Sequence, residues 1–192
     1  RTQMNPHFIF NALITIESYI YENEPKLAGK YLSDFSRLMR LILDSSVQEF
    51  IPLKKELETL RFYLELQKLR MDDNFTYTID TTLIDDLDEV NIPPMLTQPF
   101  IENAIEHGFR GKTTHGHISI DYKLVGENEL QITVKDNGTG INHNQQVNTD
   151  TNIFHRLSAI QITKERLVVL NKSKHKKVQF HISDLADEGG VG

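Results

Sequence analysis

The chain has 192 residues, 39% of them hydrophobic, and contains no cysteine. This apolar content suffices for the core of one large or two small domains, while the absence of cysteine excludes disulfide bonds and thiolate metal sites. The formal net charge of -6 argues against nucleic-acid binding, because phosphate backbones require a basic face. No apolar run reaches the roughly 20 residues of a transmembrane helix, and a start at Arg1 rather than Met predicts an excerpt of a longer protein.

The first predicted helix begins at Asn5-Pro-His7, because Asn is a good N-cap and Pro is favoured at the first helical position. Alternatively, a helix from upstream continues through this point and kinks at Pro6. In both cases His7 and Asn11 lie on one face. The helix dipole disfavours the imidazolium there and leaves a neutral ring nitrogen as a nucleophile. Taken alone, His7 is better interpreted as a surface histidine near a cap.

Apolar residues at helical spacing predict helices over residues 8–21 and 26–46, separated by a turn at residues 22–25. Such a hairpin has too little core of its own. We therefore predict that it pairs with a second copy in a dimeric four-helix arrangement. The alternative is that the hairpin packs only on the rest of the chain.

A third helix is predicted over residues 54–70, after an extended break at 50–53. Near Met71 the composition changes from helical to β-branched, which predicts a helical region over residues 1–70 and an α/β domain over residues 71–192. Residues 75–80 alternate as a strand, and residues 81–91 are acidic and predicted to be irregular.

The segment after Pro99 predicts one helix, with Gly108 at the position of a C-terminal cap. Its polar side is expected to carry Glu102, Asn103 and His107, the last two being four residues apart and therefore on the same side. An amide and an imidazole beside a carboxylate suit a hydrated Mg²⁺ and the phosphates that it carries. The alternative is an amphipathic helix whose polar face is simply solvated.

Two alternating segments, residues 118–124 and 130–135, predict an antiparallel hairpin. The second runs into Asp136-Asn-Gly-Thr-Gly140, where Asp136 could accept a hydrogen bond from an exocyclic amine and the glycines could let the backbone approach a flat ligand. The alternative is a hairpin turn, since Asn-Gly is a common turn dipeptide. His115 and His117 have no third ligand in view, which makes a zinc site a weak hypothesis.

The remaining segments are read from composition. Residues 142–155 are almost purely polar and predict a lid over a ligand. A helix is predicted over residues 162–171, in which Lys164 and Arg166 either face phosphates or are solvated. Residues 177–183 predict a further strand.

Three motifs carry a family resemblance. Glu102-Asn-Ala-Ile-Glu-His-Gly108 and Asp136-Asn-Gly-Thr-Gly140 resemble the N box and first glycine box of the GHKL ATPases. Gln3-Met-Asn-Pro-His-Phe-Ile-Phe-Asn-Ala-Leu13 resembles the phosphoacceptor motif of LytS-type sensor histidine kinases. The resemblance implies an α+β fold, in which a helical hairpin precedes an α/β two-layer sandwich of the GHKL type. The implied sheet is mixed and mainly antiparallel, with its last strand cut off here.

The resemblance also implies roles for individual residues. His7 would be the phosphorylated histidine, with Asn11 and Glu102 as candidates to orient its imidazole. ATP would be the nucleotide, with Asp136 on the adenine amine and with Asn103 holding Mg²⁺. The other nucleotide-binding residues implied are His107, Gly138, Gly140, Lys164 and Arg166.

Partners and location follow from the same resemblance. It implies phosphoryl transfer to the receiver domain of a response regulator, a homodimer, and no nucleic-acid partner. It further implies an upstream membrane sensor region, which would make this chain the cytoplasmic portion of an inner-membrane protein.

Two departures from the family pattern keep alternatives open. Leu157 and Ala159 stand where relatives usually carry a glycine pair before the lid helix, and Phe8 stands where many histidine kinases place an acidic base. The first departure motivates a catalytically degenerate dimeric scaffold with weak nucleotide binding. A GHKL ATPase that drives a clamp is a third possibility, although Pro99 occupies the position where it would need a carboxylate.

Overall fold

The computed structural model describes residues 6–109, 114–125 and 129–139. The chain divides into two compact units, one formed by Arg1–Thr76 with Thr82–Met95 and the other by Tyr77–Thr81 with Leu96–Gly192. No helix in the described residues is long and apolar enough to cross a membrane. The predicted functional division at residues 70 and 71 stays a prediction.

Three helices build the first unit, close to where the sequence predicts them. They are α1 (Pro6–Tyr21), α2 (Pro25–Ser46) and α3 (Leu53–Arg70). Pro25 occupies the first turn of α2, where its missing N–H is not needed. In α3 the acidic Glu56 lies in the first turn and the basic Lys68 and Arg70 lie in the last, an arrangement that complements the helix dipole.

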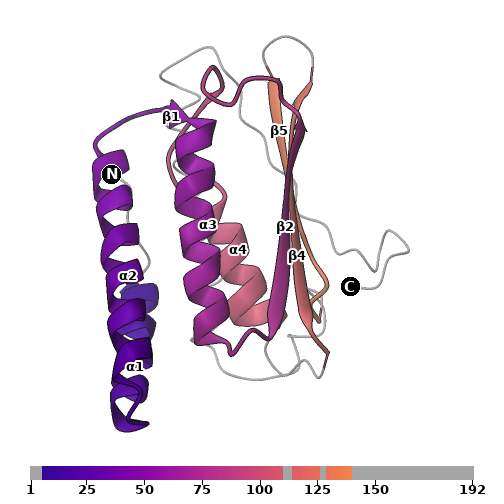
Figure 1. Cartoon of the computed structure of the whole chain (residues 1–192). Helices are drawn as coiled ribbons and strands as arrows, with labels where there is room; N and C mark the ends of the chain where they lie inside the picture. Colours follow the sequence, from indigo (N-terminus) through magenta and orange to yellow (C-terminus); the bar gives the residue numbers. More distant parts are fainter. Residues whose placement is uncertain (1–5, 110–113, 126–128, 140–192) are drawn as a thin grey trace. The chain divides into compact units, whose positions relative to one another are not determined.

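The helices of this unit pack in sequence order, with α1 against α2 and α2 against α3 (Figure 1). The short strand β1 (Ile51–Pro52) pairs antiparallel with β3 (Asn91–Ile92), and α3 contacts both strands. Side chains from all these elements form the core, chiefly Phe8, Tyr31, Leu38, Ile51, Leu53, Tyr63, Leu64, Leu66 and Ile92. The turn after α3 places two aspartates, a residue type that tolerates the left-handed region, at positive φ.

A three-stranded sheet of order β2-β4-β5 forms the frame of the second unit (Figure 1). The strands are β2 (Phe75–Leu83), of which residues 77–81 belong to this unit, β4 (Gly116–Val125) and β5 (Glu129–Asp136). Strands β4 and β5 form the predicted antiparallel pair, in register from Ile118 opposite Asp136 to Val125 opposite Glu129. Strand β2 is longer than predicted, so the prediction of an irregular segment from residue 81 is wrong for its first residues.

The helix of the second unit changes its winding part-way. It begins as α4 (Gln98–Asn103) and continues as a π-helix, η1 (Ala104–Gly108). The change is visible in the hydrogen bond from the Phe109 N–H to the Ala104 carbonyl oxygen, five residues back, at 3.0 Å. The sequence predicts one continuous helix here, because the repeat of apolar residues does not distinguish α from π winding. π turns occur often at functional sites, and this one directly follows Asn103.

Candidate functional site

The loop after β5 lies against the end of η1. The Thr139 N–H donates to the Gly108 carbonyl oxygen at 3.0 Å. A Cβ added at Gly138 would lie 2.6 Å from the Gly108 Cα and 2.7 Å from its carbonyl oxygen, so only glycine allows this approach. Two motifs about 30 residues apart in the sequence therefore meet backbone to backbone.

Gly108 is required for the same contact. A Cβ there would lie 2.9 Å from the Asp136 Oδ1, and the φ of Gly108 is outside the left-handed region. The sequence predicts this glycine as a C-terminal cap, but in the structure it is the last residue of η1, and Phe109 is the cap residue. The prediction of a cap is therefore wrong, because the demand for glycine comes from a distant loop.

Asp136 is the last residue of β5, and one of its carboxylate oxygens accepts a hydrogen bond from the following loop. Its Oδ1 accepts the Gly138 N–H at 2.9 Å, which shapes the loop. Within the described residues this is the only hydrogen bond of its side chain, and the residue is half-buried. Its Oδ2 can therefore accept a hydrogen bond from a donor such as an exocyclic amine.

Asn137 fastens the loop to the sheet, a role that the sequence analysis missed. Its Oδ1 accepts the His117 N–H at 2.7 Å, and its Nδ2 donates to the His115 carbonyl oxygen at 3.3 Å. The Asn-Gly dipeptide signals a turn, and the local hydrogen-bonding capacity of Asn was the available clue. Because both ends of this amide are used, Asn137 serves the fold rather than a ligand.

Asn103, the last residue of α4, is half-buried, and its side-chain amide makes no hydrogen bond within the described part of the chain. The start of its helix is held to the sheet by a buried hydrogen bond between the Thr97 Oγ1 and the Tyr122 hydroxyl, at 2.9 Å. The environment of Glu102 differs from the polar side on which the sequence predicts it. It is only 8% exposed and its Oε1 accepts from the Gln98 Nε2 at 3.1 Å, so it belongs to the buried side of the helix.

Both halves of the chain match known families. Residues 1–75 match the family described as "Histidine kinase", and residues 95–184 match "Histidine kinase-, DNA gyrase B-, and HSP90-like ATPase". The chain is 34% identical over 90% of its length to Sensor protein LytS of Staphylococcus epidermidis and 33% identical over 94% to Sensor histidine kinase YpdA of Escherichia coli. The chain belongs to the LytS-type histidine kinases. It spans 28% and 30% of the length of these two relatives.

The predicted resemblance to LytS-type histidine kinases and the predicted α+β fold class are therefore confirmed. Another relative is the Sensor histidine kinase/phosphatase LytS of Staphylococcus aureus, 35% identical over 73% of this chain and 24% of that protein. Several predicted site residues of this LytS-type kinase lie outside the described residues, namely Gly140, Lys164 and Arg166. The predicted lid over residues 142–155 and the departures at Leu157 and Ala159 also lie outside them.

For His7 and His107 the structure describes the backbone only. His7 lies in the first turn of α1, within the first unit, as the sequence predicts. Asn11 follows one turn later, and its carbonyl oxygen accepts the Thr15 hydroxyl at 2.9 Å. His107 lies in η1 of the second unit. Among the described residues no group of three or more His, Asp or Glu side chains could hold a metal ion.

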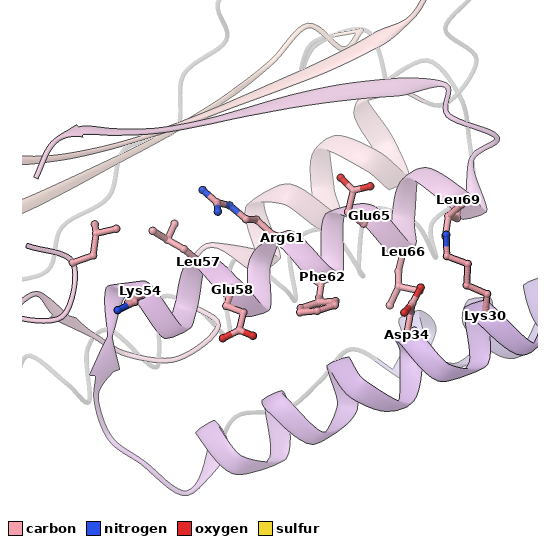
Figure 2. Close-up of a pocket in the computed structure, with 11 residues that line it drawn as sticks. Lys30, Asp34, Lys54, Leu57, Glu58, Arg61, Phe62, Glu65, Leu66 and Leu69 are labelled. Carbon is pink, nitrogen blue, oxygen red and sulfur yellow. The ribbon is translucent and has the colours of Figure 1, made fainter.

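The LytS-type kinase also has a groove of about 580 Å³ between α2 and α3 of its first unit (Figure 2). None of the predicted nucleotide-binding residues lines it. Glu58, Phe62 and Leu66 of α3 point toward α2 (Figure 2). Its lining carries three cationic side chains, Lys30, Lys54 and Arg61, and three anionic ones, Asp34, Glu58 and Glu65. Lys54 bonds Asp88 at 2.8 Å, which raises the pKa of Lys54, and Arg37 lies 4.5 Å above the Phe62 ring. The groove therefore presents no surplus of one charge that would select a nucleotide.

Proposed function

We propose that this chain is the catalytic portion of a sensor histidine kinase, which transfers the γ-phosphoryl group of ATP to His7 and then to an aspartate of a response regulator. The observation that carries the proposal is the contact of the Asp136–Gly138 loop with Gly108. That contact brings the carboxylate expected to recognise adenine against the end of the helix that carries Asn103. Membership in the histidine kinase and GHKL-like ATPase families supports the same reading.

The polar groups of the site fit an adenine nucleotide. The Oδ2 of Asp136 can accept the adenine amine while the Oδ1 remains bonded to the Gly138 N–H. The two glycines leave backbone rather than side chains at the contact, which lets the loop that carries Asp136 lie directly on the end of η1. The amide of Asn103, which makes no hydrogen bond to the described residues, can supply one oxygen ligand to Mg²⁺, which otherwise keeps water and phosphate oxygens.

Phosphoryl transfer asks little covalent chemistry of the protein, since positioning and charge neutralisation supply most of the catalysis. A neutral nitrogen of His7 would attack the γ-phosphorus, the bond to the bridging oxygen would break, and ADP would leave. Asn11 remains the candidate to orient the imidazole. The carboxylate of Glu102 is buried and already bonded to Gln98, so we assign it to holding α4 rather than to proton transfer.

We also propose that the hairpin pairs with a second copy. Large apolar side chains remain exposed along α1 and α2, although both helices have buried faces. They are Phe10, Leu13, Ile14, Ile20, Leu27, Leu32 and Leu43. On α1 these residues recur at helical spacing and form one stripe, which only Glu17 interrupts. Burial of such a stripe against its own copy would complete the core that the hairpin lacks alone.

The wider setting is part of the proposal. Relatives that carry the printed names sensor protein and sensor histidine kinase are more than three times as long as this chain. We propose that the parent protein carries a membrane sensor region upstream of a cytoplasmic kinase portion. A response-regulator receiver domain would be the phosphoryl acceptor.

The test is direct phosphorylation with labelled ATP and Mg²⁺. We expect an acid-labile, base-stable adduct that is absent in His7→Ala. Asp136→Asn should abolish the adduct without unfolding the chain, because its amide oxygen can still accept the Gly138 N–H while its NH₂ group cannot accept the adenine amine. If calorimetry with ATP or ADP and Mg²⁺ shows no binding to the wild-type chain, the degenerate scaffold is the correct reading.

A further inference from the structure

The residue after His7 is an anchor in the core. Phe8 is 4% exposed, and its ring lies between two others. Its centroid is 5.9 Å from that of Phe35 on α2 and 5.0 Å from that of Tyr63 on α3, with interplanar angles of 43° and 41°. These are separations at which tilted aromatic rings attract. The first turn of α1, which carries His7, is therefore attached to both α2 and α3 through one side chain.

Tyr63 is itself held by hydrogen bonds along α3, which are buried at Tyr63 and Gln67 and partly buried at Arg70. Its hydroxyl accepts from the Gln67 Nε2 at 2.8 Å, and the Gln67 Oε1 accepts from the Arg70 Nε at 2.7 Å. Tyr63 is 1% exposed and Gln67 is 2% exposed. The spacings of four and three residues place all three side chains on one face of the helix. Buried networks with satisfied partners hold side chains in one orientation, so the ring that meets Phe8 is held from the end of α3.

The other end of α1 is attached less firmly. The Tyr19 hydroxyl donates to the Leu69 carbonyl oxygen at 3.4 Å, close to the limit for a hydrogen bond. The Tyr19 ring meets Tyr31 edge-on at 6.2 Å and is only half-buried. Helix α3 thus touches α1 at both ends, and the tighter attachment is at the turn of His7.

We infer that Tyr63 is a positioning residue for phosphoryl transfer to His7, acting through Phe8. This inference rests on the proposed function. A shift or rotation of the first turn of α1 would displace the imidazole, and a misplacement of about 1 Å can slow a positioned reaction about 100-fold. Because the network runs from Arg70 to Tyr63, a disturbance at the end of α3 would reach the acceptor turn without any contact to nucleotide.

The test compares Tyr63→Ala with Tyr63→Phe and with Ile42→Ala, a buried truncation on α2 two turns beyond Phe35. The rate of His7 phosphorylation at saturating ATP should fall about tenfold or more in Tyr63→Ala, with the KM for ATP unchanged within about twofold. Tyr63→Phe keeps the ring but loses the hydroxyl that Gln67 holds, so its rate should fall between that of the wild-type chain and that of Tyr63→Ala. Ile42→Ala should lose stability but keep the rate within about twofold. Phe8→Leu is the second variant should Tyr63→Ala not fold, and it should also slow the rate.

Amide hydrogen exchange over residues 8–12 supplies a readout that does not depend on activity. It should accelerate in Tyr63→Ala relative to Ile42→Ala when the two are compared at equal global stability. Equal phosphorylation rates and equal exchange in these two variants would overturn the inference. Absence of His7 phosphorylation in the wild-type chain would instead overturn the proposed function, and the exchange data would then show whether the anchoring itself exists.

Discussion

Replacing Gly138 by alanine places a methyl group where the backbone of Gly108 already lies. The added Cβ would be 2.6 Å from the Gly108 Cα, about 0.4 Å inside the 3.0 Å below which real Cβ contacts essentially never occur. The Cα and the carbonyl oxygen of Gly108 both belong to the backbone and cannot rotate away, so the loop and the end of η1 must separate. Overpacking of this kind costs about 1–3 kcal/mol, and loss of the bond from the Thr139 N–H to the Gly108 oxygen adds about 0.5–1.5 kcal/mol.

The expected result is a graded series of Gly→Ala variants, measured by urea denaturation and by calorimetric titration with ADP and Mg²⁺. Gly138→Ala should lose about 2–4 kcal/mol of stability and bind ADP at least about tenfold more weakly, tenfold being 1.4 kcal/mol. Gly108→Ala should have a smaller effect, because its Cβ is within 3.0 Å only of the Asp136 Oδ1, at 2.9 Å, whereas a Cβ at Gly138 meets that oxygen at 2.5 Å and the backbone of Gly108 as well. Gly29→Ala in α2 is the matched control: its Cβ meets nothing within 4 Å, so helix propensity predicts a gain of about 0.5–1 kcal/mol.

The ordering of the three variants is the critical result. If Gly138→Ala has the same urea midpoint and the same affinity for ADP as the wild-type chain, the loop does not lie on Gly108 in solution. The reasoning that joins the two motifs is then refuted. If Gly138→Ala is destabilised but binds ADP normally, the contact is structural only, and the proposed nucleotide site loses its supporting observation.

Three further predictions concern the first unit. Glu56 is only 3% exposed, and its Oε2 accepts the N–H of Met95, which has a φ of 56°. Glu56→Ala should therefore lower the free energy of unfolding, measured by urea denaturation, by about 1–3 kcal/mol, and Glu56→Gln, which keeps an acceptor, should lower it less. Burial raises the pKa of Tyr31 above its ordinary value of 10.0, so the stability that the neutral phenol contributes is complete below about pH 10 and is lost as the pH rises from there toward the folded-state pKa. Tyr31→Phe should flatten this alkaline decline of the urea midpoint, and an unchanged slope would contradict the assignment. Ile14→Arg should convert a dimer to a monomer in analytical ultracentrifugation, and a wild-type chain that is monomeric at high concentration would refute pairing through this stripe.

The sequence by itself predicted helices α1 to α3 and the hairpin of strands, and it supplied the residues proposed for the candidate site. Helices α1 to α3 follow from apolar repeats bounded by prolines and turns, and strands β4 and β5 follow from alternation, because these signals are local. The residue types of Asn103, Asp136 and Gly138 pointed to nucleotide chemistry through their order along the chain. Nothing local, however, could show that the last of these lies on Gly108.

Only the tertiary structure decided why particular residues stand where they do. Gly108 was predicted as a cap, yet its lack of a side chain is demanded by a loop about 30 residues away. Glu102 was expected on the polar side of its helix and is buried, because Gln98 supplies the partner that makes burial tolerable. Phe8 gave no sign in the sequence that it lies between Phe35 and Tyr63. The roles of Gly108 and Phe8 are set by atoms that distant segments bring together, and a periodic pattern carries information only about a residue's near neighbours along the chain.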